Sequence, residues 1–279
     1  LAAHYGLKLK LERLHDDLTS LKHAILFLKS LISALSLSVG GLAMAQDKTI
    51  KFANQNAVGH PIVQGMEKFK EIVEKNSGGK IKVERYASMQ LGGKPPELMD
   101  QAIDGVADVV WTVVGYTPGR FPQTEVFELP FMTQGAGPAS CAYWKMFESH
   151  MKDADFKDVH IIGTWVHGPG MIHANKEIRT PTDLDGVKIR GGSRVVNQLL
   201  EKLGATPVGM PVPAVSEALS KGVIDATTIP WEVTASLKVP ELVKNHTEFT
   251  GGALYNITFV LAMNKAKYDG LSAEAKAAI

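Results

Sequence analysis

The sequence predicts an α/β fold with mainly parallel sheets, and three observations lead to that class. Short apolar runs alternate with amphipathic stretches along most of the chain, which is the pattern of strands joined by helices. The 279 residues are 45% hydrophobic and 21% charged, which suits a globular protein long enough for two lobes. The rhythm restarts after Gly168-Pro169-Gly170, so we place a lobe boundary there.

The first half of the chain contains alternating predicted strands and helices. An apolar strand at 50–53 precedes a helix over 61–75, in which Ile62, Met66, Phe69 and Val73 recur at helical spacing. The strand at 106–112 is continuously apolar, which indicates burial on both faces. The other predicted elements are a strand at 81–86, a helix from Pro95-Pro96 to 103, a helix over 138–151 and a strand at 159–165.

The second half repeats the same alternation. The predicted elements are strands at 171–175, 187–190 and 223–228, a polar turn at 181–186, and helices over 194–203 and 214–221. We therefore expect lobe I to comprise residues 47–167 with a return from about residue 250 to residue 279, and lobe II to comprise residues 168–249. Ser272 begins a terminal helix that stops at Ile279, so we expect further C-terminal helices to be truncated.

The N-terminal segment has the features of an export signal. Basic residues precede an apolar stretch over 30–39, and Ala43-Met44-Ala45 follows as a small-x-small site. We expect residues 21–45 to be a signal peptide cleaved after Ala45, which places the mature protein in the periplasm. A transmembrane anchor is the alternative, but Lys29 interrupts the apolar stretch. We expect residues 1–20 to be an over-extended N-terminus.

Composition and missing motifs exclude several classes of function. The net charge of +1 indicates no basic field for nucleic acid, and the single Cys141 allows no disulfide within the chain. The chain lacks the nucleophile elbow, the zinc-protease motif and both glycine-rich nucleotide-binding motifs. The nine histidines show no ligand spacing. We therefore predict no catalytic residue, no metal and no cofactor.

Arg190 is the residue that points to a ligand. It ends the predicted strand at 187–190, and Gly191-Gly192-Ser193 leads directly into a helix. A guanidinium can hold a carboxylate through two parallel charge-assisted bonds, and a helix N-terminus also favours an anion. Arg194, in the first helical turn, would add positive potential or a second contact. A surface ion pair with an acidic residue is the alternative for either arginine.

Aromatic and polar residues at other strand ends complete the predicted ligand site. Trp111 ends one strand, with Tyr116 five residues later, and Trp231 and Glu232 follow Pro230 after another. Ligands of α/β proteins bind outside the carboxyl ends of strands, so these side chains would form apolar walls around a carboxylate clamp. Core packing is the alternative for each Trp, and pairing with a cation is the alternative for Glu232. Asn54 and Thr228 are the remaining predicted ligand-binding residues.

Longer segments of the chain carry a family resemblance. They lie at 88–93, 105–108, 128–131, 171–190, 203–211 and 217–226. In this order they resemble the solute-binding subunits of tripartite ATP-independent periplasmic (TRAP) transporters of the DctP type, over about residues 48–279. The resemblance implies a two-lobed periplasmic-binding-protein (venus-flytrap) fold. It also implies a receptor that captures a small organic acid and delivers it to an ion-gradient-driven membrane permease.

The resemblance also assigns roles within the site. It makes Arg190 the residue that grips the ligand carboxylate, and residues 226–232 a source of further pocket residues. Many relatives carry a Gln-Glu-Asn-Pro type sequence there, from which Ile229 and Trp231 depart. We therefore expect a monocarboxylate with an apolar or aromatic body rather than sialic acid or a C4-dicarboxylate. A periplasmic enzyme on the same fold, with Glu232 as general base, is the alternative function.

Overall fold

The computed structural model describes residues 48–279. The expected signal peptide at 21–45, its cleavage after Ala45 and the expected over-extension at 1–20 lie outside these residues. Within the described part of the chain, no helix is both long enough and apolar enough to span a membrane.

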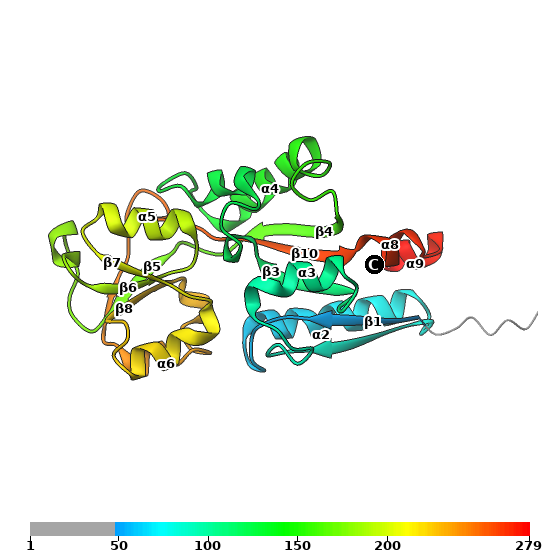
Figure 1. Ribbon diagram of the computed structural model, residues 1–279, viewed down its shortest axis with the longest axis horizontal. Coiled ribbons are helices and arrows are strands. Elements are labelled where there is room, and N and C mark those ends of the chain that lie inside the picture. The colour runs from blue at the N-terminus through cyan, green and yellow to red at the C-terminus, as the bar shows by residue number, and fades with distance from the viewer. Residues whose placement is uncertain (1–47) are drawn as a thin grey trace, which may run out of the picture. The chain divides into compact units, whose positions relative to one another are not determined.

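Two five-stranded sheets form two lobes (Figure 1). The first sheet contains, in spatial order, β2 (Ile81–Tyr86), β1 (Lys48–Ala53), β3 (Val109–Val113), β10 (Thr258–Asn264) and β4 (Val159–Val166). The second contains β7 (Thr206–Gly209), β6 (Lys188–Gly191), β8 (Ala226–Ile229), β5 (Met171–Ala174) and β9 (Asn245–Thr247). The strands at 48–166 and 258–264 thus belong to one sheet and those at 171–247 to the other. The two-lobed α/β class is confirmed, and the boundaries at residue 168 and near residue 250 stay a prediction.

Helices accompany each sheet. Those of the first lobe are α2 (Pro61–Asn76), α3 (Leu98–Ile103), α4 (Ala136–Met146), α8 (Lys265–Asp269) and α9 (Ala273–Ala278). Those of the second are α5 (Arg194–Lys202), α6 (Val215–Ser220) and α7 (Val239–Leu242). Local signals account for several boundaries: the Ser193 hydroxyl accepts a hydrogen bond from the Val196 N–H at the start of α5, and Ser272 caps α9 in the same way.

Both sheets are mixed, with four strands in one direction and one strand in the opposite direction in each, which agrees with the expectation of mainly parallel sheets. β1 pairs in parallel with β2 and β3, and β6 pairs in parallel with β7 and β8. By contrast, β10 is antiparallel to both of its neighbours, and so is β5. These two strands follow segments that connect the sheets rather than a helical crossover within one sheet, so the rule that makes βαβ units parallel does not apply to them.

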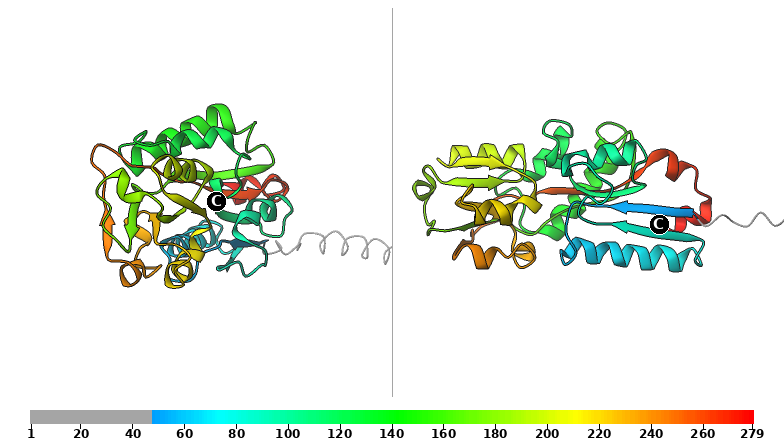
Figure 2. Two further views of the ribbon diagram at one scale, coloured as in Figure 1. Left: turned by 60° about the vertical axis from the view of Figure 1, so that its left-hand side comes forward. Right: turned by 60° about the horizontal axis from the view of Figure 1, so that its bottom comes forward.

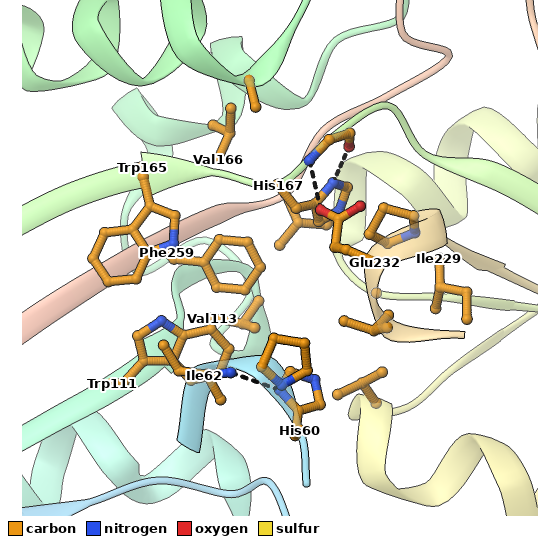
Figure 3. A pocket seen from close by; sticks show the side chains of 18 of the residues that line it. His60, Ile62, Trp111, Val113, Trp165, Val166, His167, Ile229, Glu232 and Phe259 are labelled. Carbon is orange, nitrogen blue, oxygen red and sulfur yellow. Dashed lines mark hydrogen bonds between the residues drawn. The ribbon is translucent and has the colours of Figure 1, made fainter. Parts of the chain in front are cut away.

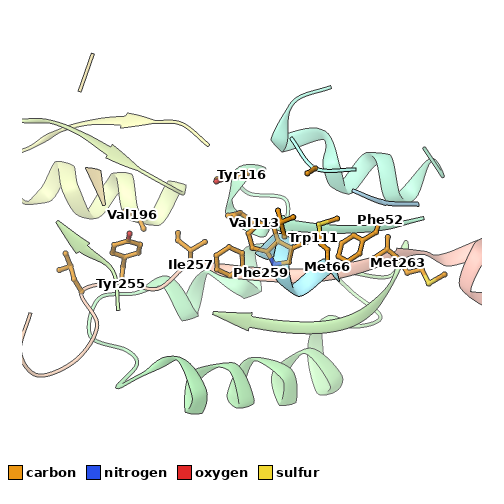
Figure 4. Packing of buried hydrophobic residues seen from close by; sticks show 14 of the residues in the cluster. Phe52, Met66, Trp111, Val113, Tyr116, Val196, Tyr255, Ile257, Phe259 and Met263 are labelled. Carbon is orange, nitrogen blue, oxygen red and sulfur yellow. The ribbon is translucent and has the colours of Figure 1, made fainter. Parts of the chain in front are cut away.

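Side chains along the strands of the first sheet alternate between its two faces, and each face belongs to a separate apolar layer. Trp111 and Phe259 belong to the cluster that also contains Met66 of α2, whereas Val110 and Val260 belong to the cluster with Tyr143 of α4. Successive strand residues point to opposite faces, so α2 and α4 cover opposite faces of this sheet (Figure 2). The layer on the α2 side continues into the second lobe through Ile257, Tyr255 and Val196 (Figure 4).

Candidate functional site

A cavity of about 370 Å³ lies between the two lobes. From the first lobe it is lined by the N-terminus of α2, the end of β3 and the start of β10, and from the second by β6 and the segment after β8. Side chains around it are drawn in Figure 3. The cavity volume falls within the usual range of small-molecule sites.

Arg190 lies on β6 at the wall of this cavity and is only 4% exposed. Its Nε donates to the Met210 carbonyl at 2.9 Å, and its Nη1 donates to the Thr228 carbonyl at 3.0 Å. Within residues 48–279, no carboxylate forms an ion pair with this guanidinium. A buried charge without a counter-ion is costly, so the remaining N–H groups of Arg190 are suited to receive an anion.

Tyr116 and Thr228 contribute to the Arg190 site in different ways. The Tyr116 hydroxyl lines the cavity and accepts a hydrogen bond from the Val212 N–H at 2.8 Å, which leaves its own proton free to donate. Burial raises the pKa of Tyr116, against the opposing effect of the Arg190 charge, so the hydroxyl keeps its proton at neutral pH. Thr228 does not line the cavity; its hydroxyl donates to the Arg190 carbonyl at 3.0 Å and holds the arginine in place.

Stacked aromatic rings form the first-lobe wall. Phe259 lies against Trp111, with ring centres 4.9 Å apart and planes at 17°, and against Trp165, at 6.2 Å and 20°. All three rings line the cavity (Figure 3). Trp111 was predicted from its strand end, and the structure adds Trp165 and Phe259 to it. Such a wall is complementary to a flat apolar body, because stacked and edge-on ring contacts are both favourable.

Two histidines line the cavity as well. Burial lowers the pKa of His60 to about 4. Burial also lowers the pKa of His167 to about 4, although its contact with the Gly168 carbonyl and the charge of Glu232 act to raise it. Both imidazoles are therefore neutral at neutral pH, and neither supplies a fixed positive charge to the site.

Glu232 lines the exposed side of the cavity. Its Oε1 accepts a hydrogen bond from the Gly168 N–H at 2.8 Å, which ties the segment after β8 to the segment between β4 and β5 (Figure 3). Of the described residues, none forms an ion pair with Glu232. Among the described residues, the Glu232 carboxylate therefore binds a backbone N–H and not a cation, unlike the pairing considered from the sequence.

Trp231 does not line the cavity, which corrects the expectation that it forms the apolar wall. Pro230 is extended, and a 3₁₀ turn over Trp231–Val233 follows, so Pro230, Glu232 and Val233 face the cavity while Trp231 does not. The indole packs instead against His173 and His246, and its Nε1 donates to Glu248 at 2.6 Å.

We expect Trp231→Ala to leave the affinity for an organic acid within about twofold of wild type, as for a surface substitution away from the ligand. Calorimetric titration with one bulky and one small acid measures this. A loss confined to the bulky acid would restore Trp231 to the wall.

Two other predicted site residues also lie off the cavity. Arg194 pairs with Glu125 of the 3₁₀ turn Pro122–Glu128, with Nε 3.1 Å from Oε1. It lines a second cavity of about 420 Å³ and not the one that holds Arg190. Asn54 is buried beyond β1, where its side chain contacts Met66 and accepts a hydrogen bond from the Asn56 N–H. Arg194 therefore connects the lobes, and Asn54 shapes the turn after β1.

Glu128 is a buried acid at the junction of the lobes. It accepts a hydrogen bond from the Thr258 hydroxyl at 3.0 Å and is only 1% exposed. Burial raises its pKa to about 7, although hydrogen bonds from Ser193 and Thr258 favour the charged form. Ser193 caps α5 in the second lobe, so this carboxyl group lies where the two lobes meet.

The raised pKa of Glu128 predicts a pH effect on stability. Between its ordinary pKa of 4.5 and the folded value of about 7, the folded protein holds a proton that the unfolded chain releases. The contribution of Glu128 is full below pH 4.5 and is lost as pH rises through 7, by up to about 1.4 kcal/mol per pH unit. We therefore expect Glu128→Gln to gain stability over wild type progressively from pH 4.5 to pH 7.

Urea unfolding of the two proteins at pH 5, 6, 7 and 8 measures that gain. The titration of the buried histidines affects both proteins alike and cancels in the difference. Glu125→Gln is the matched control, since its carboxylate lies 21% exposed in an ion pair. A Glu128→Gln difference that does not change with pH would contradict the assignment.

The site offers little for a metal ion. Among residues 48–279, no group of three or more His, Cys, Asp or Glu side chains lies close enough to bind one. The chemistry that the cavity provides is a guanidinium, the Glu232 carboxyl group, hydroxyl and imidazole groups, and aromatic faces.

Sequence reasoning missed several lining residues, although some left a signal. Trp165 ends the predicted strand at 159–165, so the strand-end argument used for Trp111 applies to it equally. Phe259 lies in the segment 257–263, which is apolar except for Thr258 and is long enough to predict a strand. Tyr255 and His167 lie in the segments that join the sheets, and only the tertiary structure brings them to the cavity.

Comparison with known proteins places this architecture among transport receptors. The family described as bacterial extracellular solute-binding protein, family 7, matches residues 52–279. The C4-dicarboxylate-binding periplasmic protein DctP of Rhodobacter capsulatus is 29% identical over 255 residues, which are 88% of this chain and 73% of that protein.

Two solved structures are more similar in sequence. One, from a marine metagenome, is a TRAP solute-binding protein specific for aromatic acid ligands, co-crystallised with 3-hydroxybenzoate; it is 47% identical, with a TM-score of 0.81, over 84% of this chain and 73% of that one. The other, a TRAP solute-binding protein from Rhodoferax ferrireducens T118 with copurified benzoate, is 50% identical, with a TM-score of 0.80, over 82% of this chain and 72% of that one.

Proposed function

We propose that an aromatic monocarboxylate is the solute of this chain, which belongs to family 7 of the bacterial extracellular solute-binding proteins and is a TRAP-type receptor for an organic acid. The observation that carries the proposal is a buried guanidinium, without an ion-pair partner among the described residues, at a cavity walled by stacked rings. The family and its structural neighbours are binding receptors, so the chain is not an enzyme, and Glu232 has no role as a general base.

The guanidinium defines where the carboxylate binds. Arg190 is held by two backbone carbonyls, so its fork is already oriented before an acid arrives. The free proton of Tyr116 supplies a second donor beside it. A carboxylate accepts from both groups, and the bidentate geometry of an arginine favours it over a single-point anion.

The aromatic wall defines the body of the acid. Trp111, Trp165 and Phe259 are suited to a flat ring, and Ile62 and Val113 extend the apolar surface. A single cationic residue with apolar walls leaves a second carboxylate unpaired, which disfavours dicarboxylic acids. The two similar structures with benzoate and 3-hydroxybenzoate support the same class of ligand.

A thermal-shift screen followed by calorimetry tests the proposal. Benzoate, 3-hydroxybenzoate, pyruvate and succinate are added at equal concentrations to the protein freed of solute by unfolding and refolding. An acid that binds the native state raises the melting temperature by mass action, and we expect the two aromatic acids to raise it most. A larger shift with succinate, or none with either aromatic acid, would overturn the proposal.

We also propose that the exported protein begins near Gln46, that the lobes divide at residue 168 and near residue 250, and that a TRAP membrane permease receives the solute. The family's extracellular location supports the first, and the membership of each sheet supports the second. N-terminal sequencing of periplasmic protein tests the cleavage site. Small-angle scattering with and without benzoate tests lobe closure, for which the radius of gyration should fall on binding.

A further inference from the structure

We propose that His60 recognises a hydroxyl group on the ring of the bound acid, through a hydrogen bond donated by its Nε2. This inference rests on the proposed function, because it names which aromatic acids the same cavity prefers. The class it selects is the hydroxylated benzoates over benzoate itself.

His60 occupies a defined position at the cavity. It is the N-cap residue of α2, it is buried, and it lines the cavity together with Pro61 and Ile62. Its ring centre lies 6.4 Å from that of Trp111. Figure 3 shows it on the side of Trp111 and Ile62, away from His167 and Glu232.

The capping role of His60 determines which nitrogen carries the proton. The Ile62 N–H donates to Nδ1 at 3.3 Å, so Nδ1 presents its lone pair to the backbone. Burial lowers the pKa of His60 to about 4, so the ring is neutral at neutral pH. A neutral imidazole that accepts at Nδ1 carries its proton on Nε2. No described residue accepts a hydrogen bond from that Nε2, which leaves one free donor.

His60 and Arg190 line the cavity from different lobes. His60 begins α2 in the first lobe, whereas Arg190 lies on β6 in the second. An acid held at Arg190 by its carboxylate therefore directs its ring toward the first-lobe wall, to which His60 belongs.

The surroundings of His60 make its donor selective. The wall beside it consists of Trp111, Ile62 and Val113, which offer no acceptor to Nε2. A phenolic oxygen accepts the hydrogen bond, whereas benzoate leaves the donor unpaired in an apolar setting. One hydrogen bond of this kind changes affinity by about tenfold. A site built around a donor also rejects an analogue that lacks the acceptor.

Calorimetry on the full mature chain tests the proposal with matched ligands. The ligands are benzoate, the three hydroxybenzoate isomers and the three methylbenzoate isomers, where methyl occupies similar space without accepting. We expect at least one hydroxy isomer to bind wild type about tenfold more tightly than both benzoate and its methyl counterpart. Absence of any such gain, with benzoate bound, overturns this inference alone; absence of binding by every aromatic acid overturns the proposed function with it.

Variants then assign the gain to His60. His60→Asn can keep the cap on α2 but is too short to present its amide where Nε2 lies, and His60→Phe keeps the ring but removes the donor. We expect both to lose the hydroxyl gain, so that the ratio of hydroxybenzoate affinity to benzoate affinity falls to about one. His150→Asn, at an exposed histidine of the first lobe, is the control and should keep the gain. A gain retained in both His60 variants, or an equal loss for benzoate and hydroxybenzoate, would show that His60 only shapes the wall.

Discussion

Replacement of Arg190 by alanine is expected to lower the affinity for benzoate by about 30-fold to several thousand-fold, the usual cost of truncating one partner of a desolvated charge pair. Arg190 is buried and, within the described residues, has no ion-pair partner of its own, so the ligand carboxylate would be its only counter-ion. Its removal leaves that carboxylate in a cavity whose lining contains no other arginine or lysine and does contain the carboxyl group of Glu232. Calorimetric titration with benzoate measures the loss.

Arg190→Lys separates charge from geometry in the same experiment. Lysine keeps the positive charge but cannot hold the Met210 and Thr228 carbonyls and the ligand carboxylate with one planar fork. We therefore expect it to bind weakly as well. Arg194→Ala is the matched control, because that arginine is half-exposed, pairs with Glu125 and lines a different cavity. If Arg190→Ala folds normally and binds benzoate as wild type does, the proposed carboxylate clamp is wrong.

Replacement of Phe259 by alanine is expected to affect stability and binding together. Phe259 is 8% exposed and stacks against two indole rings, so its truncation should cost about 3–5 kcal/mol of unfolding free energy. The same ring lines the cavity, and its loss should weaken benzoate binding by about tenfold or more, because a ring contact and the packing of both indoles disappear. Urea unfolding and calorimetry measure the two effects.

The chain offers a close control for this prediction. Phe121 is also buried in the first lobe and stacks on Phe156, with centres 4.9 Å apart and planes at 14°, but it does not line the cavity. Phe121→Ala should therefore lose a similar amount of stability and leave benzoate affinity near wild type. Phe259→Leu retains most of the volume and provides a folded variant if alanine unfolds the protein. Equal affinity losses at positions 121 and 259 would show that Phe259 acts only through packing.

Local patterns predicted most individual elements of the fold. The helical spacing of Ile62, Met66, Phe69 and Val73 predicted α2, and β2 was predicted with its observed bounds. β10 was not assigned a strand, and it is the strand that lies antiparallel between β3 and β4. Its pairing partners are far away in the chain, so no local pattern could set its direction.

The residues of the site also divide into those that local sequence patterns predict and those that only the tertiary structure brings to the cavity. The sequence alone determined the carboxylate-binding candidate Arg190, because a strand end followed by two glycines and a capped helix is a local pattern. It also placed Trp111 and Tyr116 at a strand end that lines the cavity. Only the tertiary structure decided that Trp231 turns away while Phe259 and His60 line the wall. The physical reason is that strand alternation limits a side chain to one of two faces, whereas the face that meets the other lobe depends on long-range pairing.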